Sequence, residues 1–149
     1  MKKIVAAVDF SNATSAVLEM AVRLASSFGA ELELFHVIEP APGFVAYGFT
    51  PVDYPPLDSY QHEVKRRATS KLQELLTQVR AELPAATSHM AGGSPLRELL
   101  AYVKRVGADF VILGSHGHGV ISAMLLGSVA EGMVRKATVP TLVIPASPE

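Results

Sequence analysis

The amino-acid sequence predicts an α/β fold built on a parallel sheet. Short continuous apolar runs, which are typical of strands buried on both faces, alternate along the chain with segments whose apolar residues recur at helical spacing. A glycine-rich stretch, residues 114–128, follows one apolar run and precedes a helical segment, at a point where a strand is expected to lead into a helix. Together these observations indicate β-α units that feed a parallel sheet.

The first half of the chain contains two predicted strands and two predicted helices. The apolar runs at 3–9 and 31–39 predict the strands. Apolar residues at positions i, i+3, i+4 and i+7 predict a helix after each of them. These residues are Leu18, Ala21, Val22 and Ala25 in the first helix, and Leu72, Leu75, Leu76 and Val79 in the second. Gly29 stands where a helix C-cap is expected, and Pro84 follows the second helix.

Residues 41–60 interrupt this alternation, because prolines and aromatic residues are interleaved there without helical or strand periodicity. We interpret the segment as a long connection, and long connections in compact domains tend to be functional or mobile. Its aromatic side chains either pack on the sheet surface or cover a ligand, and the sequence leaves both alternatives open.

The second half of the chain contains three further predicted strands, at 87–92, 109–114 and 139–145. A third helix is predicted to begin with Ser94 as N-cap and Pro95 at the first helical position, and to end at Gly107. Its apolar face consists of Leu96, Leu99, Leu100 and Val103. A fourth helix is predicted over 128–136. Since prolines bracket the run at 139–145 and cannot donate to a strand ladder, that strand suits a sheet edge.

Composition excludes several classes of function. The chain has 149 residues, 49% of them hydrophobic and 18% charged, so we expect 1–149 to form one domain with a substantial core. A formal net charge of −1 provides no field that attracts nucleic acid or an anionic membrane. No apolar run approaches the roughly 20 residues of a membrane span, and we expect a cytoplasmic protein. The absence of cysteine excludes disulfides, thiolate metal sites and thiol nucleophiles.

The glycine-rich stretch carries the strongest functional signal. Glycines at 114, 117, 119 and 127 with Ser128 directly after them stand where a strand leads into a helix. Glycine has no Cβ and can adopt positive φ, and a helix start offers unpaired N–H groups to an anion. We therefore predict a nucleotide phosphate site, although glycines at such a junction can also serve only a tight turn.

Other chemical motifs are missing from the chain. The loop has no lysine after its last glycine, as a P-loop requires, and its pattern GxxGxG is not the dinucleotide fingerprint GxGxxG. No GxSxG elbow is present, which argues against a serine hydrolase. His116 and His118 lack a clear third ligand, so we predict no metal site formed by the protein alone. His36 is interpreted as a satisfied core histidine, and Glu131 with Arg135 as a surface ion pair.

These residues resemble the nucleotide-binding members of the universal stress protein (UspA) family. The spacing G-x2-G-x9-G-[ST], formed by Gly114, Gly117, Gly127 and Ser128, is similar to the pattern of that family. Asp9 after the first strand, the His36–Val37 pair at the end of the second, and the segments 93–100 and 125–140 occur in family order. The resemblance therefore covers nearly the whole chain.

The resemblance implies a Rossmann-like open sheet of five parallel strands in the order 3-2-1-4-5, with helices on both faces. It implies a homodimer in which the C-terminal strands, Val139 to Pro145, pair with each other. It also implies that ATP binds, with Mg²⁺ accompanying the nucleotide. The residues that it assigns to the nucleotide site are Ala7, Val8, Asp9, Val37, Gly114, Ser115, His116, Gly117, His118, Gly119, Gly127, Ser128, Val129 and Ala130. Of these, Asp9 is expected beside the nucleoside and Val37 beside adenine.

Several functional hypotheses remain open. The first is a stress-response switch operated by ATP, and the second is a receptor for AMP or cyclic AMP. The third is a slow ATPase or an autophosphorylating protein in which Ser128 or another hydroxyl is the acceptor. The fourth is an interaction module without a ligand. Asp9 and Ser128 have an alternative structural role as helix N-caps. His118 stands where many relatives carry arginine, so a cation that faces phosphate is either lost or depends on pH.

Overall fold

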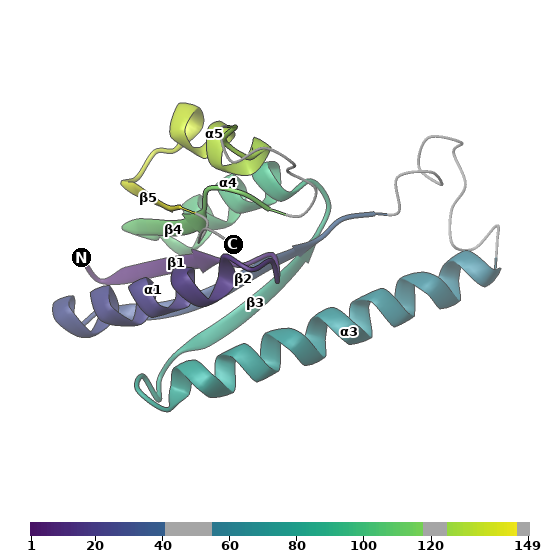
Figure 1. Cartoon of the computed structure of the whole chain (residues 1–149), viewed down its shortest axis with the longest axis horizontal. Helices are drawn as coiled ribbons and strands as arrows, with labels where there is room; N and C mark the ends of the chain where they lie inside the picture. Colours follow the sequence, from purple (N-terminus) through teal and green to yellow (C-terminus); the bar gives the residue numbers. More distant parts are fainter. Residues whose placement is uncertain (41–54, 118–124, 146–149) are drawn as a thin grey trace.

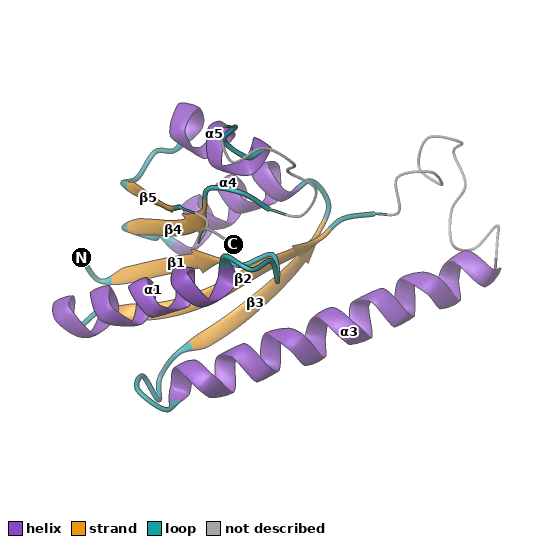
Figure 2. Ribbon diagram, viewed as in Figure 1, coloured by secondary structure: helices purple, strands orange, loops and turns teal. Residues whose placement is uncertain are grey.

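The computed structural model describes residues 1–40, 55–117 and 125–145, with only the backbone of residues 55–58 (Figure 1). The strands are β1 (Lys3–Ala7), β2 (Glu31–Ile38), β3 (Thr87–Gly92), β4 (Phe110–Gly114) and β5 (Thr141–Ile144). The helices are α1 (Thr14–Phe28), α3 (Pro55–Arg80), α4 (Pro95–Val106) and α5 (Ser128–Lys136). Strands and helices alternate along the described chain, as the sequence predicts (Figure 2).

The five strands form one parallel sheet in the order β3-β2-β1-β4-β5, which confirms the predicted strand order. Strand β1 is central, and its Val5 is in register with Glu33 of β2 and Val111 of β4. Strand β5 is the last strand at one edge, as its prolines predict, although it spans only part of the expected 139–145.

Helices cover both faces of the sheet because alternate strand residues point to opposite sides. Ile4 and Ala6 of β1 belong to a buried cluster with residues of α1 and α3. Val5 belongs to the second cluster, which contains residues of α4 and α5. Accordingly, α1 and α3 lie on one side of the sheet and α4 and α5 on the other (Figure 1).

Three of the predicted helix boundaries are confirmed. Gly29 and Gly107 are the C-caps of α1 and α4, with φ of 59° and 63°, a left-handed conformation that glycine adopts without steric cost. Ser94 is the N-cap of α4 and Pro95 begins the helix, but the Ser94 side chain makes no capping hydrogen bond. The glycine caps let the chain turn directly into β2 and β4.

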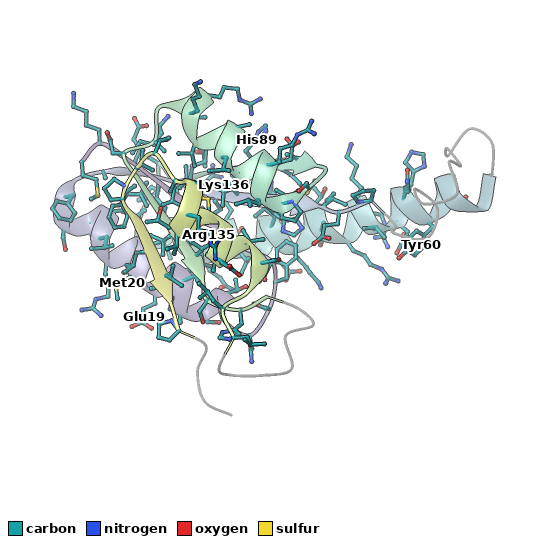
Figure 3. All side chains as sticks on the ribbon, turned by 90° about the horizontal axis from the view of Figure 1, so that it is seen from above. Glu19, Met20, Tyr60, His89, Arg135 and Lys136 are labelled. Carbon is teal, nitrogen blue, oxygen red and sulfur yellow. The ribbon has the colours of Figure 1, made fainter. Side chains whose placement is uncertain are left out.

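Helix α3 begins earlier than the sequence predicts. The proposed connection over 41–60 ends before Pro55, because 55–60 form the first turns of α3. Proline is compatible with the first turn of a helix, where its missing N–H is not needed. Tyr60 shows why the sequence did not reveal this start: it is 56% exposed, and its side chain lies far from the sheet (Figure 3). Residues 41–54 lie outside the described residues.

None of the described helices could cross a membrane, since none is both long enough and apolar enough. The longest of them, α3, has 26 residues but carries many charged side chains.

Asp109 connects the beginnings of the neighbouring strands β1 and β4. Its Oδ2 accepts hydrogen bonds from the backbone N–H groups of Lys2, at 2.8 Å, and Lys3, at 2.9 Å. These two hydrogen bonds stabilise the ionised carboxylate and lower the pKa of Asp109 below its ordinary value. The ionised side chain therefore holds the N-terminus of β1 beside the start of β4.

We expect Asp109→Ala to destabilise the protein at neutral pH and to have a smaller effect in acid. The pKa of Asp109 is lower in the folded protein than in the unfolded chain. The carboxylate therefore stabilises the folded protein at any pH above the pKa of the unfolded chain. This stabilisation is lost as the pH falls through the pKa of the folded protein. Urea denaturation of both proteins at pH 7 and below pH 3 measures this. A difference in midpoint that is as large in acid as at pH 7 would contradict the role of the ionised carboxylate.

Candidate functional site

A cavity of about 450 Å³ lies at the carboxyl ends of β1, β2 and β4. Parallel strands end at the same edge of a sheet, and the following helices begin there, so this edge gathers strand ends and helix starts. Every predicted binding residue that the structure describes lines the cavity. These residues are Ala7, Val8, Asp9, Val37, Gly114, Ser115, His116, Gly117, Gly127, Ser128, Val129 and Ala130. His118 and Gly119 lie outside the described residues.

Backbone hydrogen bonds join the first end of the glycine-rich loop to β5 and the two ends of the loop to each other. The Ser115 N–H donates to Ile144 O at 2.7 Å, and the Gly127 N–H donates to Ser115 O at 2.7 Å. A Cβ on Gly127 would lie 3.0 Å from Ser115 O and 3.3 Å from His116 Cα. Close backbone contact therefore requires glycine at 127. A positive φ is not the reason for this glycine, since the φ of Gly127 is −62°.

The start of α5 presents its first turn to the cavity. Gly127 is the N-cap and Ser128 the first helical residue, so the alternative role of Ser128 as the cap is wrong. Helical hydrogen bonding begins when Glu131 N–H donates to Gly127 O at 2.9 Å. The N–H groups of Ser128, Val129 and Ala130 therefore have no partner within the helix, and the helix dipole is positive at this end. This arrangement can bind an anion.

Asp9 lies between the end of β1 and the glycine-rich loop. Its Oδ1 accepts a hydrogen bond from the Ser11 N–H at 3.0 Å. The N-cap of α1 is Ala13, so the alternative role of Asp9 as a helix cap is wrong. A Cβ on Gly117 would lie only 2.6 Å from Asp9 Oδ2. The carboxylate thus lies directly against the loop, and both residues line the cavity.

Two buried polar atoms in the cavity wall lack hydrogen-bond partners within the described part of the chain. They are Oγ1 of Thr14, a residue that is only 7% exposed, and Nε2 of His116. The other ring nitrogen of His116, Nδ1, lies 2.7 Å from Ser115 Oγ. An unsatisfied buried polar group costs about 1–3 kcal/mol, and such groups in native proteins are usually paired.

Sequence reasoning missed the aromatic part of the wall. Phe10 lines the cavity with φ of 61°, which costs a residue other than glycine about 1–3 kcal/mol. Its ring centroid lies 4.2 Å from that of His36, whose Nδ1 donates to Val8 O at 2.8 Å. His36 is satisfied, as predicted, but it is half-buried at the cavity instead of lying in the core. Its place beside Val37 at the end of a strand was the available signal.

Sequence reasoning also missed two cations on α3. Arg67 and Lys71 are one helical turn apart and both line the cavity. The Lys71 ammonium lies 5.6 Å from the centroid of the Phe10 ring, and Arg67 Nε lies 2.9 Å from Glu63 Oε1. Hydrogen bonds from Arg66 and Arg67 lower the pKa of Glu63 to about 2. Neither cation belongs to a motif, so only the fold reveals that α3 contributes to the site.

The described residues contain no group of three or more metal-ligating side chains that could hold a metal ion. Glu131 and Arg135 form the predicted ion pair, with 2.9 Å between Arg135 Nη2 and Glu131 Oε1, and both side chains are exposed.

Solved structures of universal stress proteins share this fold. UspA from Lactobacillus plantarum gives a TM-score of 0.83 at 24% identity, covering 96% of this chain and 97% of its own. A universal stress protein in complex with cAMP gives 0.67 at 20% identity, covering 98% of each chain. One from Archaeoglobus fulgidus in complex with dAMP gives 0.68 at 22% identity, covering 97% of this chain and 98% of its own.

The sequence comparison covers almost the same extent. Universal stress protein YxiE of Bacillus subtilis is 29% identical over 145 residues, which cover 95% of this chain and 97% of YxiE. Universal stress protein A homolog 1 of Coxiella burnetii is 30% identical over 143 residues, which cover 96% of this chain and 95% of the homolog. The family model described as "Universal stress protein family" matches residues 1–145. The chain therefore belongs to the universal stress protein family.

Proposed function

We propose that this protein binds an adenine nucleotide, principally ATP, in the cavity at the ends of β1, β2 and β4, and acts as a nucleotide-operated switch in a stress response. The observation that carries the proposal is that one cavity gathers the glycine-rich loop, the start of α5 and Asp9. Its volume of about 450 Å³ lies within the roughly 300–1,000 Å³ of small-molecule sites.

In this proposal the phosphates bind at the first turn of α5, where Ser128, Val129 and Ala130 offer N–H groups. Asp9 lies beside the ribose, and Val37 at the end of β2 lies beside adenine, with Ala7 and Val8 in the same wall. Mg²⁺ would enter with the nucleotide and neutralise part of its phosphate charge.

A monophosphate ligand, AMP or cyclic AMP, is the second candidate. Its support is that two proteins of similar fold have been solved with cAMP and with dAMP. The N–H groups of α5 can bind one phosphate as well as several, so the site by itself does not define the number of phosphates. The order of affinities distinguishes the two candidates.

Any ATP hydrolysis is expected to be slow. The loop 114–128 contains no lysine, which P-loop enzymes use to hold the β- and γ-phosphates. Slow turnover would let the bound state act as a timer, and phosphorylation of Ser128 is the alternative fate of the γ-phosphate.

We also propose a homodimer that pairs the two copies of segment 139–145. The dimer is supported by the place of β5 at the edge of the sheet, where a symmetric partner would cover a half-buried apolar strand. Sedimentation equilibrium is expected to give the mass of two chains, and the mass of one chain would remove this part of the proposal.

Calorimetric titration of the nucleotide-stripped protein tests the ligand. We expect ATP with Mg²⁺ to bind more tightly than AMP or cyclic AMP, because more phosphate oxygens reach charge-assisted N–H donors. Tighter binding of cyclic AMP would replace the ATP switch by a second-messenger receptor. The absence of binding by all three nucleotides would reject the proposed function.

A further inference from the structure

We propose that Arg67 and Lys71 of α3 bind the phosphate charge of the ligand and thereby select phosphorylated nucleotides over nucleosides. This inference rests on the proposed function, because it concerns the same cavity. Helix α3 contains none of the residues that the sequence predicts for the nucleotide site. The inference gives this helix a direct part in ligand recognition.

The charge of the cavity wall is the first argument. Among the described lining residues, Arg67 and Lys71 are the only lysine or arginine side chains, and Asp9 and Glu39 are the acidic ones. The loop 114–128 contributes neither lysine nor arginine. An ATP molecule brings several negative charges into this wall, and only α3 provides full positive charges to oppose them.

The position of Lys71 is the second argument. Its ammonium lies 5.6 Å from the centroid of the Phe10 ring, and Phe10 is held at φ of 61° in the cavity wall. A cation at this distance from an aromatic ring is attracted by the face of the ring. The Phe10 ring therefore keeps the ammonium at the cavity while leaving its hydrogen-bond donors available for phosphate oxygens.

The pairing of Arg67 is the third argument. Arg67 shares Glu63 with Arg66, whose Nη2 lies 2.7 Å from Glu63 Oε1. Glu63 therefore keeps one cationic partner when Arg67 moves to a phosphate. Because all three side chains are exposed or half-buried, the exchange requires no buried charge to be left unpaired.

The test compares ATP, AMP and adenosine binding to four single variants by calorimetry. Arg67→Gln and Lys71→Gln are each expected to weaken ATP binding about ten-fold, which is typical of losing one charge-assisted hydrogen bond. Their effect on adenosine should be less than two-fold. The matched control is Arg66→Gln, which removes the same charge from the neighbouring residue, contacts the same Glu63 and does not line the cavity. The control should weaken ATP binding much less than Arg67→Gln does, because Arg67 stays at the cavity although Glu63 then pairs with it alone.

The fourth variant, Glu63→Gln, should strengthen ATP binding, because it releases Arg67 from its ion pair. Raising the salt concentration should weaken ATP binding to the wild type more than to the Arg67 and Lys71 variants, since salt screens exposed charges. Equal losses for adenosine and ATP, or equal effects of Arg66→Gln and Arg67→Gln, would overturn the assignment while the nucleotide site remains. If the wild type binds no nucleotide, the inference fails together with the proposed function.

Discussion

Gly127→Val is expected to weaken ATP binding at least about 100-fold, which corresponds to roughly 2.8 kcal/mol. A Cβ at residue 127 would meet Ser115 O at 3.0 Å, His116 Cα at 3.3 Å and Gly117 N at 3.5 Å. All three atoms belong to the backbone and cannot rotate away, so the loop and the start of α5 must separate. The N–H groups that bind phosphate would then lose their common orientation.

This substitution should also lower stability, since overpacking typically costs about 1–3 kcal/mol. The matched control is Gly92→Val at the end of β3, where a Cβ would have Ile38 O at 3.9 Å as its nearest neighbour. Gly92 does not line the nucleotide cavity. Calorimetric titration with ATP measures both variants, and thermal denaturation shows that they are folded. Unchanged ATP affinity in the Gly127 variant would show that the phosphates bind elsewhere.

Ser128→Pro is expected to bind ATP at least about ten-fold more weakly than Ser128→Ala, since a charge-assisted hydrogen bond contributes about 1.5–3 kcal/mol. Both variants remove the hydroxyl, but only proline removes the backbone N–H. Ser128 is the first residue of α5, where proline is favoured, and Gly127 before it has ψ of 154°, which suits a residue preceding proline. The proline variant should therefore fold normally.

The pair of Ser128 variants isolates one backbone donor. Binding constants from titration calorimetry give the difference between them, and circular dichroism with thermal denaturation checks that α5 is retained. If the alanine and proline variants bind ATP equally, the first N–H of α5 takes no part in phosphate binding. If both bind far more weakly than the wild type, the hydroxyl is the main contact.

The sheet was predictable because its strands are buried on both faces and appear as short continuous apolar runs. The strand order came from the family resemblance, since the same runs are compatible with other orders. Gly29 and Gly107 marked helix ends because left-handed φ favours glycine at a C-cap. The beginning of α3 was missed because its first described side chains, those of Ser59 and Tyr60, are exposed.

The predicted site residues were those adjacent to strand ends, where the sequence shows both the strand and the loop that follows. Thr14, Arg67 and Lys71 were missed because their places in the cavity depend on how α1 and α3 lie on the sheet. The left-handed conformation of Phe10 also has no sequence signal, since aromatic residues seldom adopt it. Of the two reasons that the sequence offers for glycine at 127, positive φ is wrong, and the missing Cβ matters because the backbone of the loop lies against this residue.

The central claim is that an adenine nucleotide binds with its phosphates at the start of α5. Amide NMR of the ¹⁵N-labelled protein during titration with ATP and Mg²⁺ tests it most directly, because each backbone N–H reports its own environment. We predict that the largest saturating shifts occur at Ser128, Val129 and Ala130, with further shifts at Gly117. The account would be contradicted if saturating shifts occurred at other residues while these amides stayed unchanged. It would also be contradicted if millimolar ATP caused no shifts.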